Sequence, residues 1–136
     1  MTTTTTVATV NGLTTTVKST TYFRGYLVRL NTDGSVDSFH PGASSTVSAI
    51  ALQSDGKILV AGAFTAFTPN LTSTAVPRSY LARVNENGTI DTNYNPSPNS
   101  NVNALVLQAD GKVVAGGLFT SVIPNATGTP VTRNHL

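Results

Sequence analysis

Apolar residues in this chain are gathered into short runs that are separated by polar turns. Two of these runs, Val47–Gln53 and Lys57–Phe64, flank an Asp-Gly turn that ends at Gly56, and the same arrangement recurs around Gly111. Asp-Gly between two apolar runs is the strongest short-range signal for a β-hairpin, because glycine adopts a positive φ at no steric cost. No segment repeats its apolar positions with the helical period of about 3.6 residues. The pattern therefore predicts an all-β chain without helices.

The chain also contains an internal repeat. Residues 26–37 recur as residues 80–91 with an offset of 54, and residues 47–65 recur as residues 102–120 with an offset of 55. A third copy begins at residues 131–136. A period in the fifties is longer than the roughly 40–45 residues of a WD40 blade and close to the roughly 50 residues of a kelch blade. The repeat thus predicts blades of a β-propeller.

Each repeat is expected to form one blade of four antiparallel strands. In the first repeat these strands cover Gly25–Asn31, Val36–Phe39, Val47–Gln53 and Lys57–Phe64. The last two are apolar on both faces, which is typical of strands that lie between two stacked sheets. The predicted parts of the chain are a Thr-rich N-terminal strand or arm (1–23), a first blade repeat (24–77), a second (78–132) and the start of a third (133–136).

The repeated motif is long and has a distinctive order of residues. It reads Leu-x-Arg-Leu-Asn-x-Asp-Gly-Ser-x-Asp and continues as Val-x-Ala-x-Ala-Leu-Gln-x-Asp-Gly-Lys, over Leu27–Thr65 and again over Leu81–Thr120. This motif resembles the delta-60 repeat. The resemblance implies β-propeller blades of the kind found in large bacterial extracellular and surface proteins and in some phage proteins. It implies no common activity.

Two complete repeats do not make a propeller, which closes with about four to eight blades. Three interpretations remain open: an excerpt of a longer propeller, several copies that share one ring, or copies that add head to tail into a filament. In the last two, terminal segments can complete a neighbour's blade by β-augmentation. The Thr-rich N-terminus is a candidate for the donated strand, with residues 133–136 as the stub that meets it. The alternative is that Met1–Thr6 is a disordered tail.

Composition limits the chemistry of this chain. Charged residues are 10% of the total, with eight Lys+Arg and six Asp+Glu, which is too few for the dense basic surface that nucleic acid needs. The absence of cysteine excludes disulfides, thiolate nucleophiles and cysteine-ligated zinc. Acid-base groups are scarce, and we expect neither an enzyme nor a cofactor. The start of the chain lacks the pattern of a signal peptide, and no stretch approaches the roughly 18–20 apolar residues of a membrane span.

A few polar residues are candidates for a site. Asp33, Asp37 and Asp91 lie in oxygen-rich turns that loosely resemble calcium loops, although tight turns stabilised by Asx hydrogen bonds explain the same residues. Arg29 recurs with Asp37 as Arg83 with Asp91. A pair repeated in each blade favours an architectural ion pair over a unique catalytic or metal site.

Other candidates lie outside the repeated motif. Asn70 and Asn125 begin Asn-x-Thr sequons in the linkers Thr68–Pro77 and Pro124–Thr132, which are expected to be surface loops. His40 and His135 are not at equivalent positions, so each is expected to be a lone surface histidine.

The expected function is that of a non-catalytic structural module. It would self-assemble in an extracellular, cell-surface or virion structure, either as a homo-oligomer or next to further blades of a longer chain. The alternative is a module that binds a glycan or a protein through its inter-repeat loops, since loops on a rigid scaffold tolerate variation.

Overall fold

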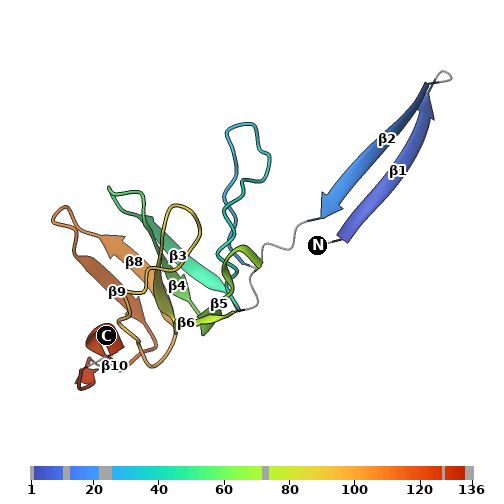
Figure 1. Ribbon diagram of the computed structural model, residues 1–136. Coiled ribbons are helices and arrows are strands. Elements are labelled where there is room, and N and C mark those ends of the chain that lie inside the picture. The colour runs from blue at the N-terminus through green and yellow to red at the C-terminus, as the bar shows by residue number, and fades with distance from the viewer. Residues whose placement is uncertain (1, 11–12, 22–25, 72–73, 127, 134–136) are drawn as a thin grey trace.

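The computed structural model describes residues 2–10, 13–21, 26–71, 74–126 and 128–133. These residues form small antiparallel sheets, and the helical structure among them is limited to two 3₁₀ turns, Pro69–Leu71 and Pro124–Ala126 (Figure 1). The predicted all-β class is confirmed, and the two 3₁₀ turns lie in the linkers, where no helix was predicted. The strands are β1 (Thr2–Val10), β2 (Leu13–Thr21), β3 (Val47–Leu52), β4 (Ile58–Gly62), β5 (Ala66–Phe67), β6 (Val76–Pro77), β7 (Leu81–Val84), β8 (Val102–Leu107), β9 (Val113–Gly117), β10 (Ser121–Val122) and β11 (Val131–Thr132).

The Thr-rich start of the chain forms a two-stranded hairpin. β1 pairs antiparallel with β2, in a register that places Thr2 opposite Thr21 and Val10 opposite Leu13. Threonine and valine favour such extended backbone because they are β-branched. In Figure 1 this hairpin (blue) extends away from the remaining strands. The predicted arm over residues 1–23 therefore contains two strands that pair with each other.

The central sheet has the strand order β3-β4-β7 and crosses the boundary between the two repeats. β4 lies antiparallel to β7, with Ile58 opposite Val84 and Leu59 opposite Arg83. A single bridge between Val84 and Ile90 extends this sheet by one further segment. The repeat pattern predicts one blade per repeat, whereas in this sheet the first strand of the second repeat pairs with the last strand of the first repeat, so the sheet combines strands of both.

β8 and β9 form a second sheet that packs on one face of the central sheet. The two are joined by the Asp-Gly turn at Gly111 and pair with Leu105 opposite Ala115. A hydrophobic cluster between the sheets has Ala61, Leu81 and Val102 at its buried centre. Small side chains at this contact let the two sheets approach closely, as stacked propeller blades do.

The opposite face of the central sheet is covered by aromatic side chains from the loop after β4 and from β5. Phe64 and Phe67 are fully buried, with ring centroids 4.7 Å apart and an interplanar angle of 63°. They belong to the larger hydrophobic cluster of the chain, together with Val60, Val84 and Phe39. The short β5–β6 hairpin holds the phenylalanines in place by pairing Phe67 with Val76.

Residues 26–36 copy the β7 region in sequence but do not pair with a neighbouring sheet. The expected strand Gly25–Asn31 contains, in its described residues, a turn at Tyr26 and one bridge from Leu30 to Val36. The same bridge joins Val84 to Ile90 in the second repeat. The two segments thus have the same internal hairpin, and they differ because only β7 lies beside a partner strand.

Candidate functional site

Asp91 is the centre of a buried ion-pair cluster at the edge of the central sheet. Its carboxylate accepts hydrogen bonds from Arg83 Nε at 2.9 Å and from Lys57 Nζ at 3.0 Å, and its other oxygen accepts the Asn93 amide at 3.0 Å. Burial by itself raises the pKa of Asp91, but the hydrogen bonds from Lys57, the Asn93 amide and Arg83 outweigh it and hold that pKa below its usual value. The Arg83 guanidinium also lies 4.6 Å from the centroid of the Tyr94 ring. Burial raises the pKa of the Tyr94 hydroxyl.

The first repeat contains a more exposed copy of this cluster. Arg29 Nε donates to Asp37 Oδ1 at 2.9 Å, and the Phe39 amide donates to the same oxygen at 2.7 Å. The Arg29 guanidinium lies 4.7 Å from the Phe39 ring centroid, as that of Arg83 lies over the Tyr94 ring. Both predicted Arg–Asp pairs are therefore formed, and each one joins the two arms of its hairpin. This geometry fits an architectural role.

The carboxylates of the three calcium candidates, Asp33, Asp37 and Asp91, accept hydrogen bonds from neighbouring protein groups. Asp33 Oδ1 accepts the Ser35 hydroxyl at 2.6 Å and the Ser35 amide at 2.9 Å. These hydrogen bonds lower the pKa of Asp33. Asn87 makes the same two bonds to Thr89, so an uncharged amide serves equally well at this position. Asp37 and Asp91 face arginines, and no three His, Cys, Asp or Glu side chains converge in the described part of the chain.

His40 is buried, with 5% of its surface exposed, so the prediction of a surface histidine was wrong for this residue. Its carbonyl accepts the Asn70 amide at 2.7 Å, which holds the linker turn against the loop before β3. The close approach of Gly88 to the His40 backbone helps to cover it, since a Cβ on Gly88 would lie 3.1 Å from the His40 nitrogen. His135 lies outside the described residues.

The two sequon asparagines occupy equivalent exposed turns. Asn70 and Asn125 each lie in a linker 3₁₀ turn with a left-handed backbone, at φ of 54° and 48°. Most described residues of the two linkers are exposed, whereas Pro69 in the first linker is buried. The threonines that complete the two sequons, Thr72 and Thr127, lie outside the described residues.

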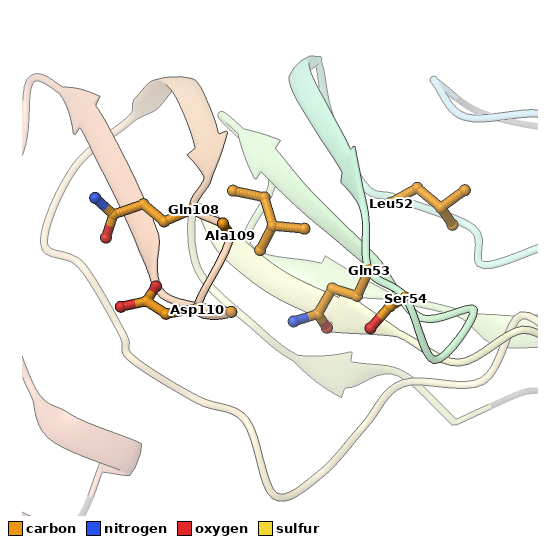
Figure 2. Close-up of a pocket in the computed structure, with 8 residues that line it drawn as sticks. Leu52, Gln53, Ser54, Gln108, Ala109 and Asp110 are labelled. Atoms are coloured by element: carbon orange, nitrogen blue, oxygen red, sulfur yellow. The ribbon is translucent and has the colours of Figure 1, made fainter.

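A groove lies between the turn of the β3–β4 hairpin and the turn of the β8–β9 hairpin (Figure 2). It has a volume of about 800 Å³ and is lined by the β3–β4 turn on one side and the β8–β9 turn on the other. Gln53 and Gln108 hold equivalent positions in the two turns, and each receives an amide hydrogen bond that closes its turn, from Gly56 at 3.1 Å and from Gly111 at 3.0 Å. The predicted hairpin turns are therefore formed, and they border a concave surface that the sequence did not reveal.

Large apolar side chains are exposed at both ends of the sheet stack. At the end nearer the N-terminus, Ile50 and Leu52 of β3 are exposed, and we call this surface the leading face. At the other end Val106, Val114 and Leu118 are exposed on β8, β9 and the residues that follow, and we call this surface the trailing face. The exposed fractions of these five side chains lie between 53% and 69%. Their positions were not predicted individually, because each has a buried or half-buried equivalent in the other repeat.

A third exposed apolar set lies on the unpaired segment of the first repeat, residues 26–36. Tyr26 is 63% exposed and Leu30 is 57% exposed, and Val28 and Val36 are exposed as well. An open gap of about 410 Å³ separates Tyr26–Val28 from the residues of β3 at Val47–Ile50.

No helix among the described residues is long and apolar enough to cross a membrane.

Comparison with known proteins places this arrangement in a described family. A family model with the description "Domain of unknown function (DUF5122) beta-propeller" matches residues 14–39, 53–94 and 108–131, which together make up more than half of the chain. The matched segments include both Arg–Asp pairs and both Asp-Gly hairpin turns. Neither the curated proteins nor the solved structures gave a match to this chain.

Proposed function

This chain belongs to the DUF5122 β-propeller family, and from that premise we propose that it is a non-catalytic structural module that assembles with further copies of itself. Its repeats are of the delta-60 type and build four-stranded blades in an extracellular, cell-surface or virion structure. A propeller blade is covered on both faces by its neighbours. The leading and trailing faces are exposed in the described part of the chain, and in this proposal a second copy covers them.

The observation that carries this proposal is the equivalence between the open faces and the packed interface inside the chain. Ile50 and Leu52 of the leading face occupy the repeat positions of Leu105 and Leu107, and Leu105 packs against the central sheet. Val114 of the trailing face occupies the repeat position of Leu59, which is fully buried. The trailing face of one copy can therefore receive the leading face of another, as the central sheet receives β8–β9. Such a contact is heterologous and leads to a ring or to a filament.

The pattern of charged residues supports a structural role. Each ion pair between an arginine and an aspartate is present in both repeats, and each closes a hairpin. A catalytic centre is not expected in every blade of a propeller, whereas a fold built from repeats can need the same stabilising ion pair in each repeat. The exposed apolar faces likewise suit association, because apolar patches of this kind are seldom left open on monomers.

The native mass of the chain tests this proposal. Light scattering, with negative-stain images of the same sample, should give a defined oligomer or a filament of the 14.1 kDa chain. Val114→Asp places a charge in the trailing face and should yield monomers, whereas Leu71→Asp changes an exposed apolar residue in the linker turn and should leave assembly intact. A wild-type chain that remains monomeric at high concentration would overturn the proposal.

The groove between the hairpin tips supports a second candidate, a module that binds a glycan or a protein. Its walls combine two leucines, Leu52 and Leu107, with the polar tips of both turns, a mixture that suits ligand recognition. The inter-repeat linkers, which do not line this groove, are the other surface in this candidate that would contact a ligand. A glycan array with the wild-type chain and with Asp110→Ala tests this candidate. The candidate is contradicted if no glycan binds and if exchange of the two linkers leaves the binding of partner proteins unchanged.

A further inference from the structure

The sheet formed by β8 and β9 has an unpaired edge in the described part of the chain. β9 holds the position of β4 in the second repeat, and β4 pairs with β7 along that same edge. Among the described strands, β9 pairs with β8 alone. Its edge therefore presents unpaired backbone groups to which another strand can add.

The same chain carries an unpaired copy of the strand that β9 lacks. Residues 26–37 repeat residues 80–91, which contain β7, and the two segments have the same internal hydrogen bonds. In each, the backbone amide of the aspartate donates to the carbonyl of the arginine, at 3.0 Å for Asp37 and 2.9 Å for Asp91. Tyr26 and Tyr80, the first residues of the two copies, share an unusual left-handed backbone, with φ of 64° and 66°. Residues 26–37 thus already have the conformation of a strand in a complete blade, so that pairing needs little further ordering.

We propose that residues 27–30 of one copy pair with the β9 edge of a second copy and complete its sheet. This inference rests on the proposed self-assembly and names the contact that produces it. The register follows from the β4–β7 pairing, in which Val60 lies opposite Ala82. When β4 is replaced by β9, and β7 by residues 27–30 of the other copy, the same register places Val28 of one copy opposite Ala115 of the next. The full set of predicted pairs is Leu30 with Val113, Arg29 with Val114, Val28 with Ala115 and Leu27 with Gly116.

Hydrogen bonds at the start of the strand extend this register. Inside the chain, Gly62 N donates to Tyr80 O at 3.1 Å, and Tyr80 N donates to Phe64 O at 2.9 Å. The equivalent residues of the β8–β9 sheet are Gly117 and Phe119. They are expected to bond Tyr26 of the incoming copy in the same way. These two bonds, one to the carbonyl oxygen of Tyr26 and one from its amide, fix the register. A slip by one residue would turn the apolar side chains to the other face.

Exposed side chains on the segment are buried by this pairing. Ala82 and Val84 are fully buried in the central sheet, whereas Val28 and Leu30, at the equivalent positions, are exposed. The operation that places residues 27–30 on β9 also places the leading face of the incoming copy on the trailing face of the receiving copy. One head-to-tail contact therefore satisfies the open strand edge and both open apolar faces.

The occupant of the β9 edge in this proposal is a second copy. The Thr-rich hairpin is a weaker candidate, because β1 and β2 already pair with each other over their full lengths. Residues 131–136 repeat residues 76–81, so His135 and Leu136 hold the repeat positions of Tyr80 and Leu81. They, and any strand that continues from them on the same polypeptide, compete with Tyr26 and Leu27 of an incoming copy for the start of this edge. The experiment separates these occupants.

Disulfide trapping tests the register directly, because the chain has no cysteine of its own. Val28→Cys and Ala115→Cys are made as separate variants, mixed and oxidised, so that a cross-link specific to the mixture must join two chains. We expect a reducible dimer in a substantial fraction of the mixture and little in either variant alone. Random mixing leaves part of the contacts without both cysteines, so the yield stays below that of the single-chain control. The double variant Val60→Cys/Ala82→Cys makes the same pair inside one chain and calibrates the yield, since facing strand positions satisfy disulfide geometry.

A mixture of Val28→Cys with Ser54→Cys, at the exposed hairpin tip, is the negative control. If the wild type assembles and the Val28–Ala115 mixture gives no more dimer than this control, the strand pairing is overturned while self-assembly stands. If the wild type is monomeric and no cross-link forms, both proposals fail. Hydrogen exchange gives a second measurement on the unmodified chain: the amides of Val113, Ala115 and Gly117, whose equivalents in β4 face β7, should become protected on assembly. Protection that is already complete in dilute monomer would show that the chain's own residues cover the edge.

Discussion

Arg83 and Asp91 lie on the two arms of one hairpin, and the Arg83 Nε atom is 2.9 Å from the Asp91 carboxylate. The third member of their cluster, Lys57, comes from the preceding repeat. This triad therefore fastens the second repeat to the last strand of the first, at the place where the sheet crosses the repeat boundary. In the first repeat, Arg29 and Asp37 form the same pair on a segment, residues 26–37, that is not paired with a described strand of another sheet.

Asp91→Asn should destabilise the fold more than Asp37→Asn. The Asp91 side chain is only 7% exposed, so the substitution removes the counter-charge of two partly buried cations, at a cost of roughly 1–3 kcal/mol in the free energy of unfolding. Asp37 lies in a more exposed pair, where the expected loss is below about 1 kcal/mol. Urea unfolding at pH 7 measures both. Equal losses would show that burial of the triad has no energetic consequence.

The stability of the chain should fall in acid, in part through Asp91. Its pKa is lower in the folded chain than its ordinary value of 3.8, so folding favours the carboxylate. This contribution is complete above the ordinary pKa and is lost as the pH falls through the lower pKa of the folded state. Thermal unfolding between pH 7 and pH 2 should show this loss in the wild type and a shallower decline in Asp91→Asn. Asp33→Asn is the comparison, because hydrogen bonds from Ser35 also lower the pKa of Asp33, but in an exposed turn, so its effect on the acid decline should be smaller than that of Asp91→Asn.

The hairpins could be predicted from the sequence, but their neighbours could not. Asp-Gly turns fix β3–β4 and β8–β9 through local chemistry, and the repeated arginine and aspartate predict their own pairing. The partner of β4 is a different problem, because the first strands of both repeats have nearly the same pattern. Only packing in three dimensions selects β7, which lies beside β4 once the intervening linker has folded back.

Burial of individual residues was also beyond the sequence pattern. His40 is a polar residue in a loop, and it is buried because the Pro69–Leu71 turn and Gly88 close over it. The contrast between Val114 and Leu59 is similar: the two residues hold one repeat position, but only Leu59 has a neighbouring sheet over it. Such differences depend on what surrounds a repeat and not on the repeat itself.

Gly117→Ala should destabilise the fold, whereas Gly116→Ala should be nearly neutral. A Cβ at Gly117 would lie 2.2 Å from the Asn101 carbonyl oxygen, so the backbone would have to shift, at a cost of roughly 1–3 kcal/mol. A Cβ at Gly116 meets no atom within 4 Å, and its equivalent in the first repeat is Ala61. Urea unfolding of the two variants gives the comparison. A neutral Gly117→Ala would mean that the bulge between Val102 and Ala104 relaxes freely.

Lys112→Ala should weaken assembly and leave the fold of the single chain unchanged. Lys112 holds the repeat position of Lys57, but its side chain is 78% exposed and its ion pair is with the nearby Asp110. If a second copy completes the β9 edge, Lys112 reaches the incoming Asp37 as Lys57 reaches Asp91. An ion pair of this kind contributes about 0.5–1 kcal/mol, so the midpoint concentration of assembly should rise about two- to five-fold, with less effect at high salt.

Lys57→Ala is the matched variant for this prediction. It removes the same contact inside the chain and should lower the free energy of unfolding of the monomer by about 1 kcal/mol. Sedimentation over a concentration series measures assembly, and urea unfolding in dilute solution measures the fold. Because both lysines occupy one repeat position, an effect of Lys112→Ala on unfolding in dilute solution, with assembly unchanged, would place its contact inside the chain and contradict the contact between copies.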